Sequence, residues 1–243
     1  MKITFHKKIA AYFGYEFTRI SKSIFQNQML HTIELINRHN IDLVIDVGAN
    51  MGQFAIDLRN AGYNGQIISF EPITECYDHL QLIADKNWTI ENYALGDTNT
   101  TETINISNKT VFSSILNTSE FGKSNFSESI KIIDKQTIHI KKLDDVIHSL
   151  VNNLDNKKIF LKLDTQGYDN RVILGATDTL AYVHVLQTEA SCKAIYEETP
   201  PFYETLKQLS TIGFNITGIF PLSQDKNTME LLEFDCLLIR SSK

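Results

Sequence analysis

A glycine-rich turn follows the first long apolar run of the chain, in the stretch IDLVIDVGANMGQF at residues 41–54. Gly48 and Gly52 have no Cβ, so they permit a tight turn, a close approach to a ligand and a close start to the next helix, while Asn50 tolerates a left-handed backbone. Ligands of open parallel sheets bind beyond the carboxyl ends of the strands. The spacing therefore predicts a ligand-binding turn that runs from Gly48 through Ala49 to Gly52.

The residues around this turn indicate which ligand it holds. A dinucleotide-binding turn reads G-x-G-x-x-G and aims a helix N-terminus at a pyrophosphate, whereas this chain has G-x-N-x-G preceded by Asp46. A carboxylate there would repel a pyrophosphate but suits an ammonium and a sulfonium, so its sign favours S-adenosylmethionine. Glu71, in SFEP after the next apolar run, is placed to accept hydrogen bonds from both ribose hydroxyls. An NAD site would use such an acid too, so Glu71 does not discriminate.

A second candidate for chemistry is the stretch IFLKLDTQG, residues 159–167. Alternate side chains of a strand share a face, which puts Lys162 and Asp164 together, opposite Leu161 and Leu163. Asp164, at the carboxyl end, is our candidate for a general base or an acceptor-positioning residue. Lys162 would keep it ionised or bind the acceptor directly. The structural alternative is that the two only pair with each other, or that Asp164 caps the following helix.

Other residues are weaker candidates for the site. His184 lies inside an apolar strand, which is typical of a core histidine, and His139 alternates with apolar residues on a strand-like stretch. Glu189 ends another apolar run and would form with Asp164 a carboxylate pair that suits Mg²⁺ and a sugar diol. No dense cluster of ligands requires a metal, however. Tyr196 follows that run, where a substrate-facing loop is expected, and is a candidate for stacking on a sugar ring.

An alternation of strands and helices must position these residues. Runs of strand length that are apolar throughout indicate a mostly parallel sheet covered on both faces, so the expected fold is α/β, a doubly wound, Rossmann-like sheet. The expected strands are 43–47, 66–70, 88–95, 158–164, 182–189, 214–220 and 234–240, and the expected helices are 51–61, 74–86, 169–180 and 201–212.

Two segments stand apart from this alternation. Apolar residues at helical spacing, without Pro, predict an amphipathic helix over residues 1–40, which would be an N-terminal helical cap on a domain covering 41–243. Three roles stay open for this cap: packing on the monomer, forming a homodimer, or covering the active site. Residues 97–135 are rich in Ser, Thr and Asn and predict a polar insertion that is either a solvated excursion or functional.

Composition narrows the classes of partner. The 243 residues carry a formal net charge of -6, which argues against nucleic acid or an anionic membrane as a partner. Cys76, Cys192 and Cys236 are far apart and form no CxxC spacing, so the sequence indicates neither a disulfide framework nor a structural zinc site. No run approaches the length of a membrane span and no signal-peptide pattern is visible, so we expect a cytoplasmic protein without a membrane span.

Several stretches together resemble the FkbM family of S-adenosylmethionine-dependent methyltransferases. In chain order they are VIDVGANMGQF, ISFEPITECYDHL, ENYALGD, VFSSIL, IFLKLDTQGYDNRVILGA and LQTEAS, and the resemblance covers roughly residues 41–240. The run D-x-G-A-N-x-G, later followed by K-x-D-x-x-G and I-L-G-A, is its most specific part. The resemblance implies a class I methyltransferase sheet, in which the last strand is antiparallel, and O-methylation of a hydroxyl, often on a sugar or polyketide.

The resemblance also implies roles for individual residues. The cofactor turn matches Asp46 to Gly52, the ribose acid matches Glu71, the loop flanking the adenine matches Leu95, Gly96 and Asp97, and a segment lining the pocket matches Ser113 and Ser114. The chain departs from the family at Gln166 and Asp169, where many members carry Glu. We assign Gln166, with Glu189 and Tyr196, to the substrate side of the site.

The expected function is therefore O-methylation of a sugar hydroxyl in a polysaccharide or glycoconjugate, or of another hydroxylated small molecule. One alternative is an NAD-dependent oxidoreductase on the same sheet, against which Asp46 and the incomplete glycine pattern count. Another is a non-catalytic scaffold that binds the cofactor and assists a partner enzyme. The presence of Lys162 and Asp164 beside an intact cofactor turn counts against the scaffold.

Overall fold

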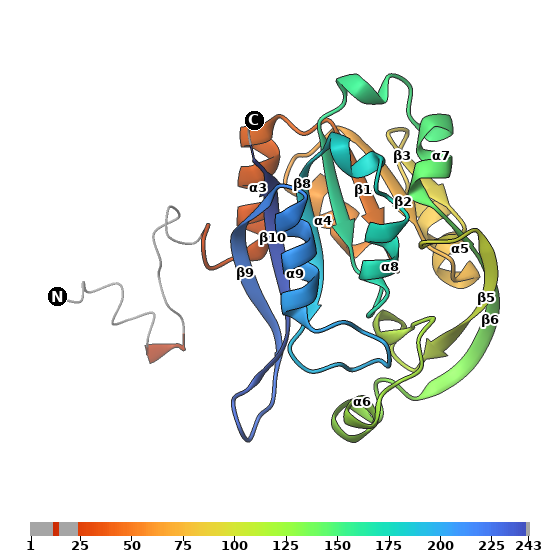
Figure 1. The fold of residues 1–243 in the computed structure, drawn as a ribbon, viewed down its shortest axis with the longest axis vertical. Coiled ribbons are helices and arrows are strands. Elements are labelled where there is room, and N and C mark those ends of the chain that lie inside the picture. The colour runs from red at the N-terminus through yellow and green to blue at the C-terminus, as the bar shows by residue number, and fades with distance from the viewer. Residues whose placement is uncertain (1–11, 15–23, 242–243) are drawn as a thin grey trace, which may run out of the picture.

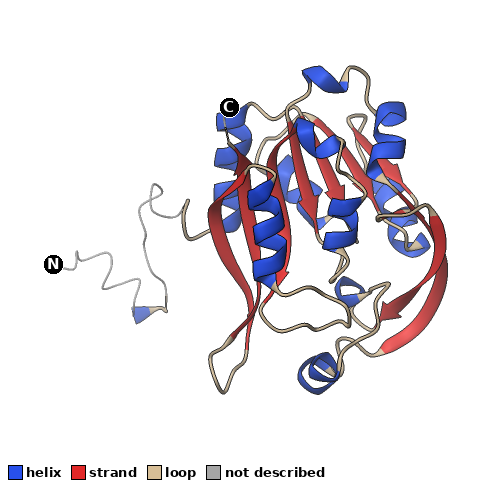
Figure 2. Cartoon of the chain, in the orientation of Figure 1, coloured by secondary structure: helices blue, strands red, loops and turns tan. Residues whose placement is uncertain are grey.

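The computed structural model describes residues 12–14 and 24–241, and its centre is a seven-stranded sheet with helices on both faces (Figure 1, Figure 2). The strand order is β3-β2-β1-β7-β8-β10-β9. The strands are β1 (Leu43–Val47), β2 (Gln66–Phe70), β3 (Trp88–Glu91), β7 (Ile159–Leu163), β8 (Val183–Ser191), β9 (Phe214–Gln224) and β10 (Leu231–Arg240).

The direction of the strands confirms the expected class I methyltransferase sheet. Strands β3, β2, β1, β7 and β8 run parallel, whereas β10, the last in the chain, is inserted antiparallel between β8 and β9. The order reverses between β1 and β7, which is where an open α/β sheet forms its ligand crevice. The expected cofactor turn and the expected catalytic strand are therefore neighbours.

Strands β1 and β7 are buried along their whole length, so any polar side chain on them needs a partner. The register supplies these partners. Asp46 lies directly between Ser69 on β2 and Lys162 on β7, and Lys162 in turn lies beside Gln187 on β8. Residues that pair directly point to the same face. Polar side chains from four adjacent strands thus form one row across the sheet.

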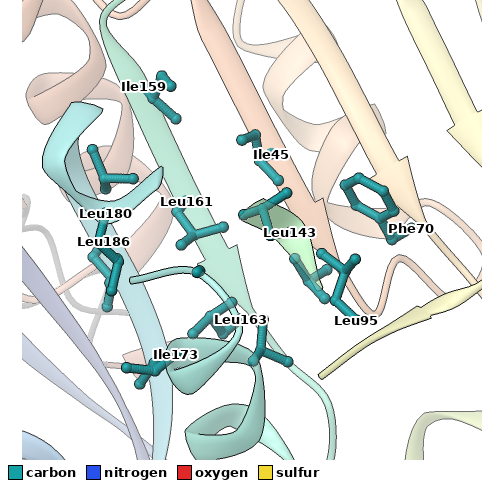
Figure 3. Packing of buried hydrophobic residues seen from close by; sticks show 14 of the residues in the cluster. Ile45, Phe70, Leu95, Leu143, Ile159, Leu161, Leu163, Ile173, Leu180 and Leu186 are labelled. Atoms are coloured by element: carbon teal, nitrogen blue, oxygen red, sulfur yellow. The ribbon is translucent and has the colours of Figure 1, made fainter. Parts of the chain in front are cut away.

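Helices cover both faces of the sheet and close two apolar cores. One face carries α3 (Gln28–His39), α4 (Gln53–Asn60) and α5 (Thr74–Ile83), and the other carries α7 (Leu143–Leu150), α8 (Asp169–Leu174) and α9 (Phe202–Thr211). On the second face, Leu143 and Ile173 pack with Ile45 and Leu161 of the central strands (Figure 3). Helix α8 is shorter than the expected 169–180 because the chain turns at Gly175.

A second, smaller sheet corrects two expectations. It has the order β4-β6-β5 and comprises β4 (Ala94–Leu95), β5 (Thr100–Ser107) and β6 (Ile132–Lys141), with α6 (Glu120–Phe126) between β5 and β6. The single strand expected over 88–95 is wrong, because β3 ends at Glu91 and the chain then enters this sheet. The polar insertion over 97–135 forms an antiparallel ribbon whose buried face includes Ile104 and Ile138, while its exposed face explains the polar composition.

The N-terminal prediction is confirmed only in part. Helix α3 begins after Asn27, whose side chain accepts a hydrogen bond from the amide of Leu30, and residues 24–26 form a turn rather than a helix. Leu35 and Ile36 of α3 pack into the core beneath the sheet. The rest of the expected cap, 1–11 and 15–23, lies outside the described residues. Within the described ranges, no helix has the length and apolar character needed to cross a membrane.

Candidate active site

A cavity of about 530 Å³ opens at the carboxyl ends of β2, β1 and β7. Its size is typical of a small-molecule site, for which pockets of about 300–1,000 Å³ are usual. Most of the predicted site residues line it, namely Gly48, Ala49, Asn50, Glu71, Leu95, Ser113, Ser114, Lys162, Asp164 and Gln166. The fold thus brings the turn, the strand-end acids and the Lys–Asp pair into one cavity.

The remaining predicted residues, Asp46, Gly52, Gly96, Asp97, Glu189 and Tyr196, are not among the residues that line this cavity. Asp97 instead pairs with Arg171 at 2.9 Å. Gly96 packs closely against Gly175. A Cβ added to Gly175 would overlap the carbonyl oxygen of Gly96. Of the three residues expected around the adenine, only Leu95 therefore faces the cavity.

The glycines of the turn are required by packing. Gly48 and Gly52 have φ values of 77° and 84°, and Asn50 one of 49°, all in the left-handed region. A Cβ on Gly48 would lie 2.0 Å from the carbonyl oxygen of Asp164, and one on Gly52 would lie 2.7 Å from a methyl of Leu80. The close approach expected at Gly48 is therefore to the end of β7, which the turn holds in place.

The amides of the turn are used within the protein. Gly48 and Ala49 donate to the carbonyl oxygen of Phe70, at 3.0 and 3.3 Å, and Asn50 donates to Glu71 Oε2 at 2.7 Å. A pyrophosphate site needs such amides to point at the ligand. Since these three donate to β2 and its end, the turn does not offer them to a dinucleotide.

Glu71 is a buried acid at the edge of the cavity. Its two oxygens accept hydrogen bonds from the amides of Asn50, at 2.7 Å, and Ile73, at 2.8 Å. Burial raises the pKa of Glu71 to about 7 although these amides lower it. A carboxylate has roughly four lone-pair sites, so Glu71 can still accept hydrogen bonds from a ligand.

Asp46 differs from its expected position. It is fully buried behind the cavity wall, where its carboxylate accepts from Lys162 Nζ at 3.0 Å and from Ser69 Oγ at 3.4 Å. A direct contact with a ligand ammonium is therefore not open to it. Lys162, which lies directly opposite on β7, pairs with the carboxylate that was expected to face a ligand. Asp46 acts on the cavity through Lys162.

Lys162 connects the buried acid to the cavity. Its Nζ lies 3.0 Å from Asp46 Oδ1 and 3.3 Å from Asp164 Oδ2, and the ring of Phe54 packs against it. Burial disfavours its charge, but the carboxylates of Asp164 and Asp46 outweigh burial and raise the pKa of Lys162. Lys162 is therefore a permanent cation. Asp164, whose side chain is 41% exposed, is the part of this pair that a ligand reaches.

Gln166 separates the two carboxylates that were expected to pair. Its Nε2 donates to Asp164 Oδ1 at 3.0 Å and to Glu189 Oε2 at 3.1 Å, and its Oε1 lies 3.0 Å from the hydroxyl of Tyr196. A glutamate here could not donate to both acids. The departure from the family at Gln166 thus has a structural role. Tyr196 is buried beneath this network and is not available to stack on a sugar.

Glu189 belongs to a buried carboxyl pair. Burial and the negative charge of Glu233 raise the pKa of Glu189 well above its usual value. Asp169, the other departure from the family, is buried and accepts from the amides of Thr165 and Glu189 at 2.8 and 3.0 Å. Both acids therefore support the loop after β7. Among the described residues, no group of three or more His, Cys, Asp or Glu side chains is arranged to hold a metal ion.

Neither histidine considered as a base lies at the cavity. His139 is on β6, where its Nδ1 lies 3.2 Å from the hydroxyl of Thr101, and His184 contacts the carbonyl oxygen of Tyr182 at 3.0 Å. Their placement leaves Asp164 as the predicted base that reaches the cavity.

The sequence reasoning missed several polar residues that line the cavity. They are Gln28 and Thr32 on α3, Gln187 on β8 and Asp235 on β10. A signal existed for two of them, because Gln187 in VLQTE and Asp235 in FDCLLIR interrupt apolar strands. The α3 residues carried no such signal, since a polar side chain on an amphipathic helix is usually exposed.

The chain is similar to several solved structures. Solved structures similar to the chain include magnesium protoporphyrin IX methyltransferase from Synechocystis with bound S-adenosylmethionine, at 11% identity and a TM-score of 0.45, covering 99% of both chains. They also include an rRNA methylase from Streptococcus thermophilus, at 9% identity and a TM-score of 0.45, covering 89% of this chain and 98% of that one. A comparison with curated proteins found no significant match.

The family comparison is decisive. The model described as "Methyltransferase FkbM domain" matches residues 46–216, a segment that contains the turn, Glu71, Lys162 and Asp164. This match covers well over half of the 243 residues. The chain therefore belongs to the FkbM family of S-adenosylmethionine-dependent methyltransferases.

Proposed function

We propose that the protein transfers the methyl group of S-adenosylmethionine to a hydroxyl of a carbohydrate, with Asp164 as the residue that takes the hydroxyl proton. The observation that carries this proposal is the position of Asp164. Its carboxylate is partly exposed in the cavity and is held from two sides, by Lys162 at 3.3 Å and by Gln166 at 3.0 Å. A base fixed in this way can meet an acceptor oxygen in a defined direction.

The residues around the β2 end of the cavity fit the cofactor. Glu71 presents a carboxylate that accepts hydrogen bonds, as ribose hydroxyls require, and Ile73 and Leu95 add apolar surface suited to an adenine ring. When bound, S-adenosylmethionine supplies a methyl group on a positively charged sulfur that can be displaced. In this proposal Gly48 and Asn50 shape the turn beside the cofactor. Their left-handed backbone lets the turn lie close to the end of β2 and to the end of β7.

The protein's own residues then have distinct roles. Lys162 cannot serve as a base, because its raised pKa keeps it protonated. It instead holds the Asp164 carboxylate in place through the contact at 3.3 Å. Asp164 accepts the proton from the acceptor hydroxyl while the oxygen attacks, and the proton then leaves to solvent through the exposed side of the carboxylate. Asp46 fixes the position of Lys162 from behind.

The carbohydrate part of the proposal rests on the FkbM resemblance and on the nature of the cavity wall. Carboxylates and amides from Asp164, Asp235 and Gln187 line the cavity beyond the expected cofactor. Such groups suit a polyhydroxylated acceptor better than an apolar one.

The test is transfer of a carbon-13 methyl group from labelled S-adenosylmethionine to bacterial glycan fractions, read by NMR, in which an O-methyl carbon differs in chemical shift from N-, S- and C-methyl carbons. An O-methyl signal on a sugar is expected with the wild type. Asp164→Asn is expected to reduce the rate about 100- to 10,000-fold, the usual contribution of a positioned base. Methylation of another class of atom would contradict the proposed reaction, and an unchanged rate in Asp164→Asn would remove that residue from the mechanism.

A further inference from the structure

One end of the cavity supplies part of its polar wall, but none of its residues has so far been given a contact with a ligand. It lies over β8 and β10, beneath α3, and is lined by Gln187, Asp235, Thr32 and Gln28, which together we name the α3 pocket. Three of these four residues, all but Gln187, lie outside the segment 46–216 that matches the family model. The pocket is therefore a feature of this chain that the family match does not describe.

Two buried polar atoms of the α3 pocket have no hydrogen-bond partner among the described residues. They are Oε1 of Gln187 and Oγ1 of Thr32. Gln187 is 3% exposed and Thr32 is 0% exposed, so bulk solvent does not satisfy them. Unpaired buried polar groups are rare in native proteins because they destabilise the fold. Both residues line the cavity, so a ligand bound there would become the partner of these oxygens once the side chains turn toward it.

The polar groups of the α3 pocket are suited to a ligand that donates hydrogen bonds. Asp235 already accepts from Gln28 Nε2 at 2.5 Å and from Gln187 Nε2 at 3.3 Å, which uses one N–H of each amide. The Lys162 cation is committed to Asp46 and Asp164. What remains for a ligand is the second N–H of each amide, the carbonyl oxygen of Gln187, the carboxylates and the Thr32 hydroxyl. Hydroxyl groups fit this set, whereas a carboxylate or phosphate on the ligand would be repelled.

The order of the strands places the α3 pocket on the acceptor side of the site. Glu71 ends β2 and Asp164 follows β7, two strands away, while the pocket lies over β8 and β10, on the far side of β7. Adjacent strands are about 4.8 Å apart, so β8 and β10 lie about 5 and 10 Å from β7. In an in-line transfer the acceptor oxygen lies on the side of the methyl group that faces away from the sulfur. Since Glu71 marks the cofactor end of the cavity, this side is the one beyond Asp164.

We infer that the α3 pocket is the acceptor subsite and that it binds hydroxyl groups of a neutral sugar unit, with Gln187 Oε1 and Thr32 Oγ1 as hydrogen-bond partners. This inference rests on the proposed function and makes it more specific in two ways. It excludes uronic acids and phosphosugars as the unit next to the methylated hydroxyl. It also gives α3 a role in binding the acceptor.

The test uses protein saturated with S-adenosylhomocysteine and saturation-transfer NMR. The probes are the methyl glycosides of glucose, galactose and mannose, with the methyl glycosides of glucuronate and galacturonate as anionic counterparts. We expect at least one neutral glycoside to bind, and the uronates not to bind. Thr32→Val and Gln187→Met are each expected to weaken the binding at least tenfold. Gln81→Leu, an exposed position on α5 outside the cavity, is the control and should bind like the wild type.

Thr32→Val also distinguishes a loss of binding from a loss of folded protein. Thr32→Val keeps the shape of the side chain and removes an unpaired hydroxyl, so it should raise the Tm of the ligand-free protein by about 2–4 °C. Binding of the uronates as strongly as the neutral sugars, binding of no neutral glycoside, or full binding by both variants would overturn the inference.

The affinity for S-adenosylhomocysteine distinguishes a failure of the acceptor assignment from a failure of the proposed function. The affinity for S-adenosylhomocysteine should be the same in the wild type, Thr32→Val and Gln187→Met. A loss of this affinity in the variants, with 5′-methylthioadenosine still bound normally, would mean that the α3 pocket holds the amino-acid end of the cofactor, and the acceptor assignment would be wrong. A wild type that does not bind S-adenosylhomocysteine would contradict the proposed function itself.

Discussion

The ammonium of Lys162 lies 3.0 Å from the carboxylate of Asp46, which is fully buried. The two residues sit at the same register on neighbouring strands, directly below the cavity. Lys162 also contacts Asp164 at 3.3 Å, so a buried acid, a buried cation and a partly exposed acid form one series. This series fixes the position of the carboxylate that faces the cavity.

The first prediction concerns the stability of this pair. Removing one partner of a buried ion pair typically costs about 3–5 kcal/mol, because the other charge stays buried without compensation. Asp46→Asn and Lys162→Met should therefore each lower the free energy of unfolding by about that amount. The double variant should lose much less than the sum of the two. Urea unfolding measures all three, and additive losses would contradict the pairing.

A second prediction concerns the turn. Gly48→Ala places a Cβ against the carbonyl oxygen of Asp164 and should destabilise the protein by about 3–5 kcal/mol, from steric overlap and a left-handed backbone together. Gly62→Ala is the matched control, since Gly62 has a φ of 94° but no atom within 4 Å of an added Cβ. It should cost only about 1–2 kcal/mol. Equal losses in thermal or urea unfolding would show that Gly48 is not held against β7.

A third prediction follows from Asp235. Burial, with the charge of Asp164, raises the pKa of Asp235 to about 7. The folded state then binds this proton more tightly than the unfolded state, so stability is lost as the pH rises from about 4 to about 7. Above pH 7 the loss amounts to roughly 4 kcal/mol. Asp235→Asn removes it, and the variant should be more stable than the wild type at pH 8 but not at pH 4.

The comparison with the wild type isolates this effect. Burial lowers the pKa of His31 and of His39, so these histidines give the opposite slope, with stability gained as the pH rises toward 6.5. They are present in both proteins and cancel in the difference. A stability difference between Asp235→Asn and wild type that stays constant from pH 5 to pH 8 would show that Asp235 is ionised throughout.

A fourth prediction concerns the pH dependence of cofactor binding. Burial raises the pKa of Glu71 to about 7. The ionised carboxylate accepts ribose hydroxyls more strongly than the neutral acid, because hydrogen bonds to charged groups are stronger. The affinity for S-adenosylhomocysteine should therefore fall as the pH is lowered from 8 to 6. In Glu71→Gln this part of the pH dependence should be absent, and the same slope in both proteins would assign it to another group.

The sheet could be predicted from the sequence because burial leaves a direct mark on it. Strands such as β1 and β7 are buried on both faces and read as continuous apolar runs. The small sheet left no such mark, since β4 has only two residues and half of β5 is exposed. Its strands are stable because of partners that lie far away in the sequence.

The site was predictable only where a residue's chemistry and its place on a strand agreed. Asp164 and Glu71 end strands and line the cavity as expected. The partner of Asp46 could not be read from local spacing, because Lys162 is 116 residues away along the chain. Thr32 and Gln187 become a pair of ligand contacts only when α3 packs on the sheet, and this packing is not readable from local spacing.

The most direct test of the account is calorimetric titration of the wild type, Glu71→Ala and Asp97→Asn with S-adenosylhomocysteine, and with NAD⁺ in parallel. Loss of two hydrogen bonds to a charged acceptor at a buried ribose should weaken binding by roughly 2–3 kcal/mol, about 30- to 150-fold. We predict that the homocysteine compound binds the wild type, that Glu71→Ala shows this loss, and that Asp97→Asn, whose side chain faces Arg171, binds like the wild type. Binding of NAD⁺ instead, or equal affinity in Glu71→Ala and wild type, would contradict the assignment of the cavity as the cofactor site.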